Sequence, residues 1–282
     1  MPHVPTRRLP VPGHRSRPLA VLAAALLLVA LSSASAAAHP APPAGEQATV
    51  VLVHGAFADA SSWGGVVERL QRTGHTVVAP ALPMRGIASD SAYLASVVNQ
   101  IDGPVLLVGH SYAGAVISNA ATTTPNVVGL VYVSGYAPEE GESLNDIAST
   151  SKDSLLGPAL VEKQYPTGQG EETATELFVD QAAFPAVFAA DLPAEQAAVL
   201  AASQRPVAAA AFAEPNGAPA WKTLPSWAVV GTGDKAAGAD VVRANAERAG
   251  ARITELDGSH LIMVSQPRAV TDVILSALDD VC

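Results

Sequence analysis

The chain has 282 residues, with 16 Lys plus Arg against 26 Asp plus Glu and a formal net charge of −10. This length allows one large α/β domain, and a composition that is 49% hydrophobic and 15% charged is not that of a disordered chain. The shortage of Lys and Arg argues against nucleic acid as a partner, because phosphate binding needs clustered basic residues. The single cysteine, Cys282, excludes a disulfide framework and a cysteine-based zinc site.

Residues 1–38 have the layout of a secretory signal peptide. Arginines precede an unbroken apolar run over 19–31, and small residues of the A-x-A form follow at 34–36 and 36–38. The run is shorter than the roughly 20 residues that a membrane span needs, and no cysteine follows it for lipid attachment. We therefore expect a secreted protein with no stable membrane anchor after processing, by an export route that the sequence leaves open. Residues 39–46 are expected to form a Pro/Ala linker.

Apolar segments rich in β-branched residues alternate with segments of helical periodicity over the next part of the chain. Six strands are expected, over 48–53, 76–79, 104–108, 127–133, 226–230 and 252–256. Helices are expected from Trp63 up to Gly74 and over 91–101, 112–123, 240–249 and 267–278. Continuous apolar strands separated by helices predict a mostly parallel six-stranded sheet flanked by helices.

The alternation breaks down over 135–224, which is rich in Ala, Pro and Glu and has helical patches over 171–183 and 194–204. An insertion that returns to the same sheet predicts a helical cap over the carboxyl edge of the strands, where α/β sheets bind ligands. The core is accordingly expected over 47–134 and 225–282.

The sequence Val108-Gly109-His110-Ser111-Tyr112-Ala113-Gly114 stands where a predicted strand meets a predicted helix. It resembles the nucleophile elbow, G-x-S-x-G, of the α/β-hydrolase fold, with Ala113 in place of the second glycine. Such a turn lifts a serine hydroxyl above the sheet at a helix N-terminus, where backbone N–H groups stabilise negative charge. Ser111 is the candidate nucleophile.

The resemblance implies an acid and then a histidine further along the chain. His260, in Gly258-Ser259-His260, is the only histidine after Ser111 and follows the sixth predicted strand. Asp234, in Gly231-Thr232-Gly233-Asp234, follows the fifth and is the candidate acid. Asp257 is a competitor in the same loop as the histidine, and Asp240 is a second competitor that suits a helix N-cap better.

An oxyanion hole is expected from two backbone N–H groups. One belongs to Tyr112, and the other to the His54-Gly55-Ala56-Phe57 loop after the first strand, where Ala56 is the first choice and Phe57 the second. Structural roles are expected for the remaining histidines after residue 47, His54, His75 and His110. Lys235, beside the candidate acid, is expected to be a solvated surface charge.

The motifs VLVHGAF, GHSYAG, GTGDK and GSH resemble the branch of the α/β hydrolases that contains plant methylesterases and hydroxynitrile lyases. The resemblance implies a serine esterase that cleaves small carboxylic esters through an acyl-enzyme, with no metal or cofactor. It gives a small-molecule ester as the partner and does not indicate an oligomeric state.

Two other functions are compatible with these motifs. One is a lyase reaction on the same triad, and the other is a small-molecule-binding protein that has kept the fold. In the lyase branch a Thr follows the first-strand His and a Lys follows the catalytic His, whereas this chain has Gly55 and Leu261 there. Without that lysine, cyanide would leave into a pocket that lacks a counter-charge, and hydrolysis is therefore the favoured reading.

Overall fold

The computed structural model describes residues 47–281. The signal peptide expected over 1–38, the linker over 39–46 and Cys282 lie outside the described residues. Among the helices of the described part, none is both long enough and apolar enough to span a membrane.

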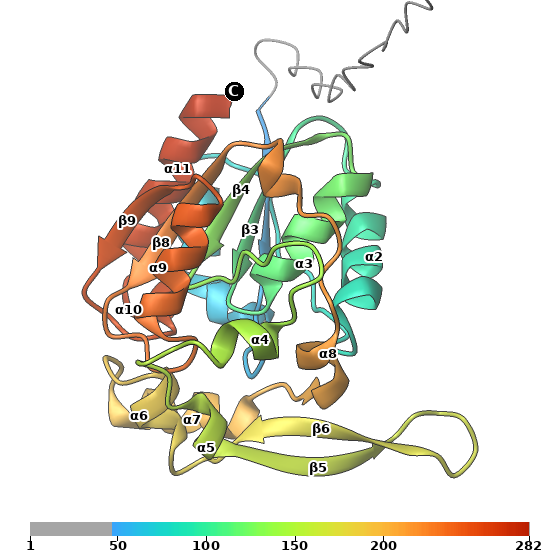
Figure 1. The fold of residues 1–282 in the computed structure, drawn as a ribbon. Helices are drawn as coiled ribbons and strands as arrows, with labels where there is room; N and C mark the ends of the chain where they lie inside the picture. The colour runs from blue at the N-terminus through green and yellow to red at the C-terminus, as the bar shows by residue number, and fades with distance from the viewer. Residues whose placement is uncertain (1–46, 282) are drawn as a thin grey trace, which may run out of the picture. The chain divides into compact units, whose positions relative to one another are not determined.

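A six-stranded sheet forms the centre of the described chain (Figure 1). Its strands are β1 (Thr49–Val53), β2 (Val77–Val78), β3 (Val105–His110), β4 (Val127–Val133), β8 (Ser226–Gly231) and β9 (Arg252–Leu256). The spatial order is β2-β1-β3-β4-β8-β9, and every neighbouring pair is parallel. All six predicted strands are present. Every residue of β1, β3 and β8 is buried, as expected for apolar strands covered on both faces.

Helices cover both faces of this sheet (Figure 1). They are α1 (Gly64–Arg72), α2 (Ile87–Val98), α3 (Ala113–Ala120), α9 (Ala239–Arg248), α10 (Ile262–Ser265) and α11 (Pro267–Val281), with the short 3-10 helices η1 (Ala60–Trp63) and η2 (Ala121–Thr123). The helix expected from Ser91 begins four residues earlier, at Ile87. Asp240 is not the N-cap of α9, since Gly238 holds that position and Asp240 accepts hydrogen bonds from Ser151 Oγ (2.7 Å) and Lys152 N (2.8 Å).

The segment between β4 and β8 forms a cap that contains helices and a second sheet. Its elements are α4 (Leu144–Ala148), α5 (Leu156–Ala159), β5 (Leu160–Pro166), β6 (Thr173–Val179), α6 (Phe184–Phe188), α7 (Ala194–Ser203), β7 (Val207–Ala208), α8 (Ala209–Ala213) and η3 (Ala220–Lys222). The antiparallel order is β5-β6-β7, and the β5–β6 hairpin extends away from the central sheet (Figure 1).

The cap is therefore less helical than the sequence predicts. The helix expected over 194–204 is confirmed as α7, but the helix expected over 171–183 is wrong, because β6 occupies most of that range. β6 pairs with β5 along its whole length, from Leu160 opposite Val179 to Pro166 opposite Thr173. Pairing with a partner strand outweighs the local helical pattern here.

Candidate active site

Parallel strands end at one edge of the central sheet, and the chemically active side chains expected from the sequence follow β3, β8 and β9 at that edge. The cap lies across the same edge in Figure 1. The site is therefore built where the core loops and the cap meet, as is usual for open α/β sheets.

Ser111 lies in the sharp turn between β3 and α3, with a left-handed backbone conformation (φ 53°) that non-glycine residues rarely adopt. Its backbone N–H donates to Val133 O (3.2 Å), and its carbonyl accepts from Gly114 N (2.9 Å) and Tyr136 N (3.1 Å). These bonds hold the strained turn in place.

The turn has no room for side chains at two of its positions. A Cβ on Gly109 would lie 2.7 Å from Ala113 O, and a Cβ on Gly114 would lie 2.9 Å from Tyr136 N. After the serine, the backbone of a neighbouring segment therefore comes closest to Gly114 and not to Ala113. Ala113 consequently fits at the position where the general motif has glycine. This geometry accounts for the departure from the motif that the sequence displays.

His260 and Asp234 are in direct contact, with His260 Nδ1 2.7 Å from Asp234 Oδ2. Each is about 1% exposed. Because a carboxylate only accepts, Nδ1 carries the proton of this bond. The other carboxylate oxygen of Asp234 accepts from the backbone N–H groups of Ala236 (2.9 Å) and Ala237 (3.0 Å), which fixes the side chain. His260 Nε2 is buried and has no hydrogen-bond partner among residues 47–281.

The acid and histidine loops meet because β8 and β9 are neighbouring strands. Gly233 N donates to Gly258 O (2.9 Å), and a Cβ on Gly231 would lie 2.8 Å from Ser259 O. The competing carboxylate, Asp257, is exposed at the start of the histidine loop. The contact with His260 therefore belongs to Asp234.

The histidine that precedes Ser111 contacts His260. The two rings lie 4.6 Å apart between centroids, and His110 Nε2 donates to the carbonyl of His260 (3.0 Å). His110 is completely buried, and this burial, with the nearby His260, lowers its pKa well below 6.5. A neutral His110 adds no second positive charge beside His260.

The histidine of the first-strand loop holds that loop together. The ring of His54 donates from Nδ1 to Gly55 O (3.0 Å) and accepts at Nε2 from Leu82 N (3.0 Å). Burial lowers its pKa, because the charged ring would be desolvated and would lose the acceptor at Nε2. The structural role expected for His54 is confirmed, and Lys235 is exposed as expected.

Two backbone N–H groups beside Ser111 are available to a ligand. Among the described residues, Ala56 N and Tyr112 N make no hydrogen bond, whereas Phe57 N donates to Arg205 O of the cap (3.0 Å). Gly55 brings this loop against the nucleophile turn, since a Cβ on it would lie 2.7 Å from Ser111 Cβ. The second choice, Phe57, is thus already occupied, and the first choice, Ala56, is not.

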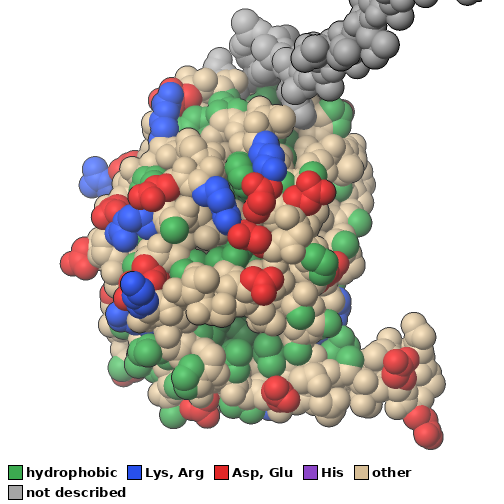
Figure 2. Space-filling model, viewed as in Figure 1, with side chains coloured by type: hydrophobic (Ala, Val, Ile, Leu, Met, Phe, Trp, Pro, Cys, Tyr) green, Lys and Arg blue, Asp and Glu red, His purple; other side chains and the backbone are tan. Residues whose placement is uncertain are grey.

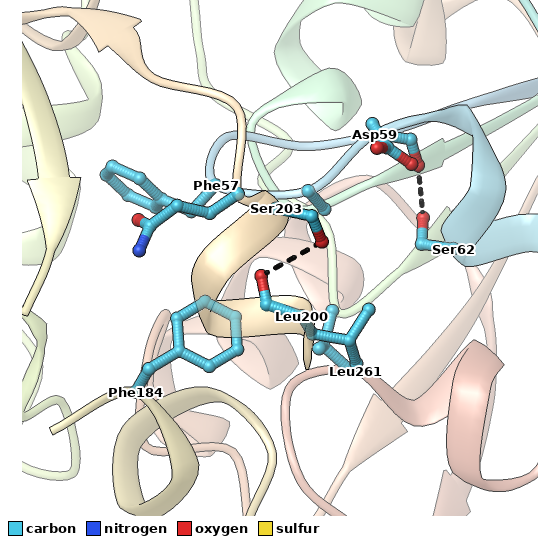
Figure 3. Close-up of a pocket in the computed structure, with 9 residues that line it drawn as sticks. Phe57, Asp59, Ser62, Phe184, Leu200, Ser203 and Leu261 are labelled. Carbon is cyan, nitrogen blue, oxygen red and sulfur yellow. Dashed lines mark hydrogen bonds between the residues drawn. The ribbon is translucent and has the colours of Figure 1, made fainter. Parts of the chain in front are cut away.

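The cap is also tied to the loop that carries His260. Phe188 O of α6 accepts from Leu261 N (3.1 Å) and Ser259 Oγ (3.2 Å), and the Phe188 ring lies 4.7 Å from the His260 ring between centroids. A crevice with a free volume of only about 10 Å³ remains between Phe57, Phe184 and Leu261 (Figure 3). Cap and core are therefore in close contact on this side of Ser111.

A larger cavity, of about 440 Å³, is lined entirely by residues of the segment between β4 and β8. Its large apolar lining residues are Tyr136, Leu156, Leu160, Leu177 and Phe212, and hydroxyl, amide and small residues of the α4–α5 segment line the rest. Figure 2 shows apolar side chains gathered in the hollow between α4 and the cap sheet. Tyr136 links the cavity to the nucleophile turn, because its backbone N–H donates to the Ser111 carbonyl (3.1 Å), although neither Ser111 nor His260 lines the cavity.

Sequence reasoning did not single out the residues by which the cap and α2 contact this site. Phe188 and Arg205 contribute through backbone carbonyls, which any residue type has, so no side-chain pattern could have indicated them. Asp90 is a buried carboxylate that accepts a hydrogen bond from the Tyr112 hydroxyl (2.9 Å). Because the sequence predicts that the helix begins one residue later, at Ser91, it does not indicate a buried role for Asp90.

Comparison with known proteins agrees with this architecture. Residues 50–273 match the alpha/beta hydrolase family. The chain belongs to that family. It is similar in structure to polyneuridine aldehyde esterase, with a TM-score of 0.70 at 22% identity over 82% of this chain and 99% of that one. This similarity concerns the fold.

Two curated bacterial proteins are similar in sequence. A carbendazim-hydrolysing esterase of Nocardioides sp. (strain SG-4G) is 32% identical over 110 residues, which are 34% of this chain and 46% of that protein. The lipase LipV of Mycobacterium tuberculosis (strain ATCC 25618 / H37Rv) is 30% identical over 132 residues, 43% of this chain and 51% of that protein. The chain thus spans about half the length of the curated relatives that it matches.

Proposed function

We propose that this α/β hydrolase cleaves small carboxylic esters through an acyl-enzyme formed on Ser111. His260 takes the proton of the Ser111 hydroxyl as the oxygen attacks the ester carbonyl, and then returns it to the departing alcohol. Asp234 orients His260 and stabilises its cationic form. The backbone N–H groups of Ala56 and Tyr112 stabilise the oxyanion. Water, activated by the same histidine, then releases the acid.

The bond between Asp234 and His260 is the observation that carries this proposal. It places the proton on Nδ1 and leaves the Nε2 lone pair buried without a hydrogen-bond partner among residues 47–281. No hydrogen bond joins Nε2 to the Ser111 hydroxyl in this structure; the His260 ring lies 4.6 Å between centroids from the ring of His110, the residue before Ser111. A base in this state can accept a hydroxyl proton. The names esterase and lipase of the two curated relatives are consistent with the same chemistry.

The larger cavity suits the apolar part of the ester. Its volume of about 440 Å³ and its wall of Tyr136, Leu177 and Phe212 fit a modest aryl or alkyl group. Ser149, Ser151 and Ser154 also line the cavity, but their hydroxyl groups already donate to Asp146 O, Asp240 Oδ1 and Ala236 O, so the apolar wall is what favours such a group. We infer that esters with a short or aromatic group are better substrates than long-chain esters.

The same site disfavours the lyase reaction. Leu261, where the lyases have a lysine, is buried against Phe57 and Phe184. The neighbouring cation, Lys235, is exposed. Cyanide leaving this site would therefore be desolvated without a counter-charge, which costs several kcal/mol. Ester hydrolysis forms an oxyanion at the backbone N–H groups instead, and needs no such cation.

Turnover of p-nitrophenyl esters of increasing chain length, with mandelonitrile assayed on the same preparation, tests the proposed function. We expect ester cleavage that Ser111→Ala abolishes and negligible release of cyanide. Cyanide release faster than ester turnover would favour the lyase, and tight binding of esters without turnover would favour a binding protein.

We further propose that the protein is secreted and that removal of a signal peptide leaves a mature N-terminus between Ala36 and His39. The pattern of charge, apolar run and small residues supports this. Mass spectrometry of the protein that its natural host secretes tests this proposal. Recovery of a chain that retains residues 19–31 would contradict it.

A further inference from the structure

Tyr112 has the only large side chain in the turn that follows the nucleophile. Its neighbours Ser111, Ala113 and Gly114 are small, so Tyr112 is the residue through which a large side chain can add to the backbone hydrogen bonds that hold this turn. The Tyr112 side chain is completely buried. Its backbone N–H is one of the two groups proposed to bind the oxyanion, and contacts that fix this side chain therefore help to fix that N–H.

Asp90 fixes the hydroxyl end of the Tyr112 side chain. The Tyr112 hydroxyl donates to Asp90 Oδ2 (2.9 Å), and Arg85 N donates to Asp90 Oδ1 (3.3 Å). Asp90 is fully buried in the first turn of α2, where the helix N-terminus favours a negative charge. Burial raises the pKa of its carboxyl, and the hydrogen bond from Tyr112 opposes this rise. A buried carboxylate depends strongly on such a donor.

The helix that carries Asp90 is itself held firmly. Ser91 Oγ donates to Val116 O (3.2 Å), which joins α2 to α3. Glu214, from the cap, accepts from Ile87 N (2.6 Å) and Ala88 N (3.2 Å) at the start of α2. Phe212, two residues earlier in the cap, lies 6.1 Å from the Tyr112 ring between centroids. Both the ring and the hydroxyl of Tyr112 are thus held from outside the turn.

We propose that Asp90 is a positioning residue for ester hydrolysis: through the Tyr112 hydroxyl it sets the direction of the Tyr112 N–H in the oxyanion hole. This inference rests on the proposed function. Donors in an oxyanion hole act on the transition state more than on the bound substrate. Loss of the Asp90–Tyr112 bond should therefore lower kcat and leave KM nearly unchanged.

The variants Tyr112→Phe and Asp90→Asn, and the double variant, test the bond. We expect each single variant to lower kcat by about 10- to 100-fold, with KM within about threefold of the wild type. The double variant should lose no more than the worse single variant, because the two residues act as one unit. Tyr93→Phe, an exposed tyrosine on α2, and Asp102→Asn, an exposed carboxylate beyond it, are matched controls with unchanged kinetics.

A pair of inhibitors separates positioning from a general loss of structure. The Ser111 oxygen adds to the carbonyl of a trifluoromethyl ketone while its proton passes to His260, and the ketone oxygen becomes an oxyanion at the two N–H groups. The corresponding methyl ketone binds without addition. Tyr112→Phe should weaken the trifluoromethyl ketone by about the same factor as kcat/KM and the methyl ketone by less than about twofold. Equal weakening of both ketones would overturn the role of Asp90.

The outcomes also separate this inference from the proposed function. A wild-type protein without ester turnover, or a Ser111→Ala variant that retains it, would reject the proposed function and the role of Asp90 with it. Turnover that depends on Ser111 but is unchanged in Tyr112→Phe and Asp90→Asn would reject only the positioning role. Should Asp90→Asn fail to fold, Tyr112→Phe alone decides, because it removes a single hydroxyl group.

Discussion

At the scale of single residues, the proposed ester hydrolysis depends on the side chains of Ser111, His260 and Asp234. Ser111→Ala and His260→Ala should each lower kcat by about 10⁴-fold or more, and the double variant should lose little beyond the worse single one. Asp234→Asn should lower kcat on the order of 10⁴-fold with folding intact, because the amide favours the wrong tautomer of His260. Steady-state kinetics on a p-nitrophenyl ester measure each loss.

Asp257→Asn is the matched control for the acid, since Asp257 lies in the histidine loop but is exposed. Its kinetics should stay close to those of the wild type. A large loss in Asp257→Asn together with a mild effect of Asp234→Asn would show that the acid has been assigned to the wrong residue.

We expect Gly55 to be needed for a different reason, because two loops approach each other closely at this position. A methyl group at this position would lie 2.7 Å from Ser111 Cβ and 2.8 Å from His110 O. We predict that Gly55→Ala lowers kcat by at least about 100-fold, because it pushes the Ala56 N–H away from the reacting oxygen. Gly64→Ala, in open space at the start of α1, is the control, and its activity should be unchanged.

At the scale of elements, the cap contacts the start of α2 through the side chain of Glu214. Glu214 supplies acceptors to two N–H groups that the helix cannot satisfy itself. Glu214→Ala should lower the free energy of unfolding by about 1–2 kcal/mol, and Glu214→Gln by less, because the amide keeps an acceptor but loses the charge. Denaturant unfolding measures both changes.

Hydrogen exchange provides the local readout of the same contact. The amides of Ile87 and Ala88 should exchange faster in Glu214→Ala, whereas Glu140→Ala, at an exposed position, should leave them unchanged. Unchanged protection of these two amides in Glu214→Ala would show that Glu214 does not cap the helix in solution.

At the scale of the whole molecule, two buried histidines make stability depend on pH. The folded-state pKa values of His54 and His110 are lowered below 6.5, so the folded protein binds fewer protons than the unfolded chain in mildly acidic solution. The free energy of unfolding should therefore fall as the pH drops below 6.5, by up to about 2.7 kcal/mol per pH unit for two protons. Urea titrations between pH 7.5 and 5 measure this slope.

The slope should become smaller in His110→Gln, which cannot take up a proton. A stability that stays constant between pH 7 and 5 would contradict the prediction and would mean that both histidines are protonated as readily in the folded protein as in the unfolded chain.

The sequence by itself determined the central sheet and the positions of its strands. Long apolar runs such as 104–108 and 127–133 can be buried only between two layers, and helical periodicity between them leaves one arrangement, a parallel sheet. The candidate residues Ser111, Asp234 and His260 could be chosen because each follows a strand at the same sheet edge. The sequence also showed that the motif has Ala113 in place of its second glycine and that Gly114 follows it.

Only the tertiary structure decided the rest, because it depends on partners far apart in the chain. The sequence made Asp234 the first candidate acid, but that it and not Asp257 contacts His260 follows from the approach of the loops after β8 and β9. β6 is a strand because β5 lies beside it, although its local pattern is helical. Ala56 rather than Phe57 is free because a cap carbonyl occupies Phe57 N, and Asp90 gains its place only when α2 packs on α3. Backbone bonds and buried charges of this kind leave no periodic trace in a sequence, since any residue has a carbonyl and burial is a property of the packed chain.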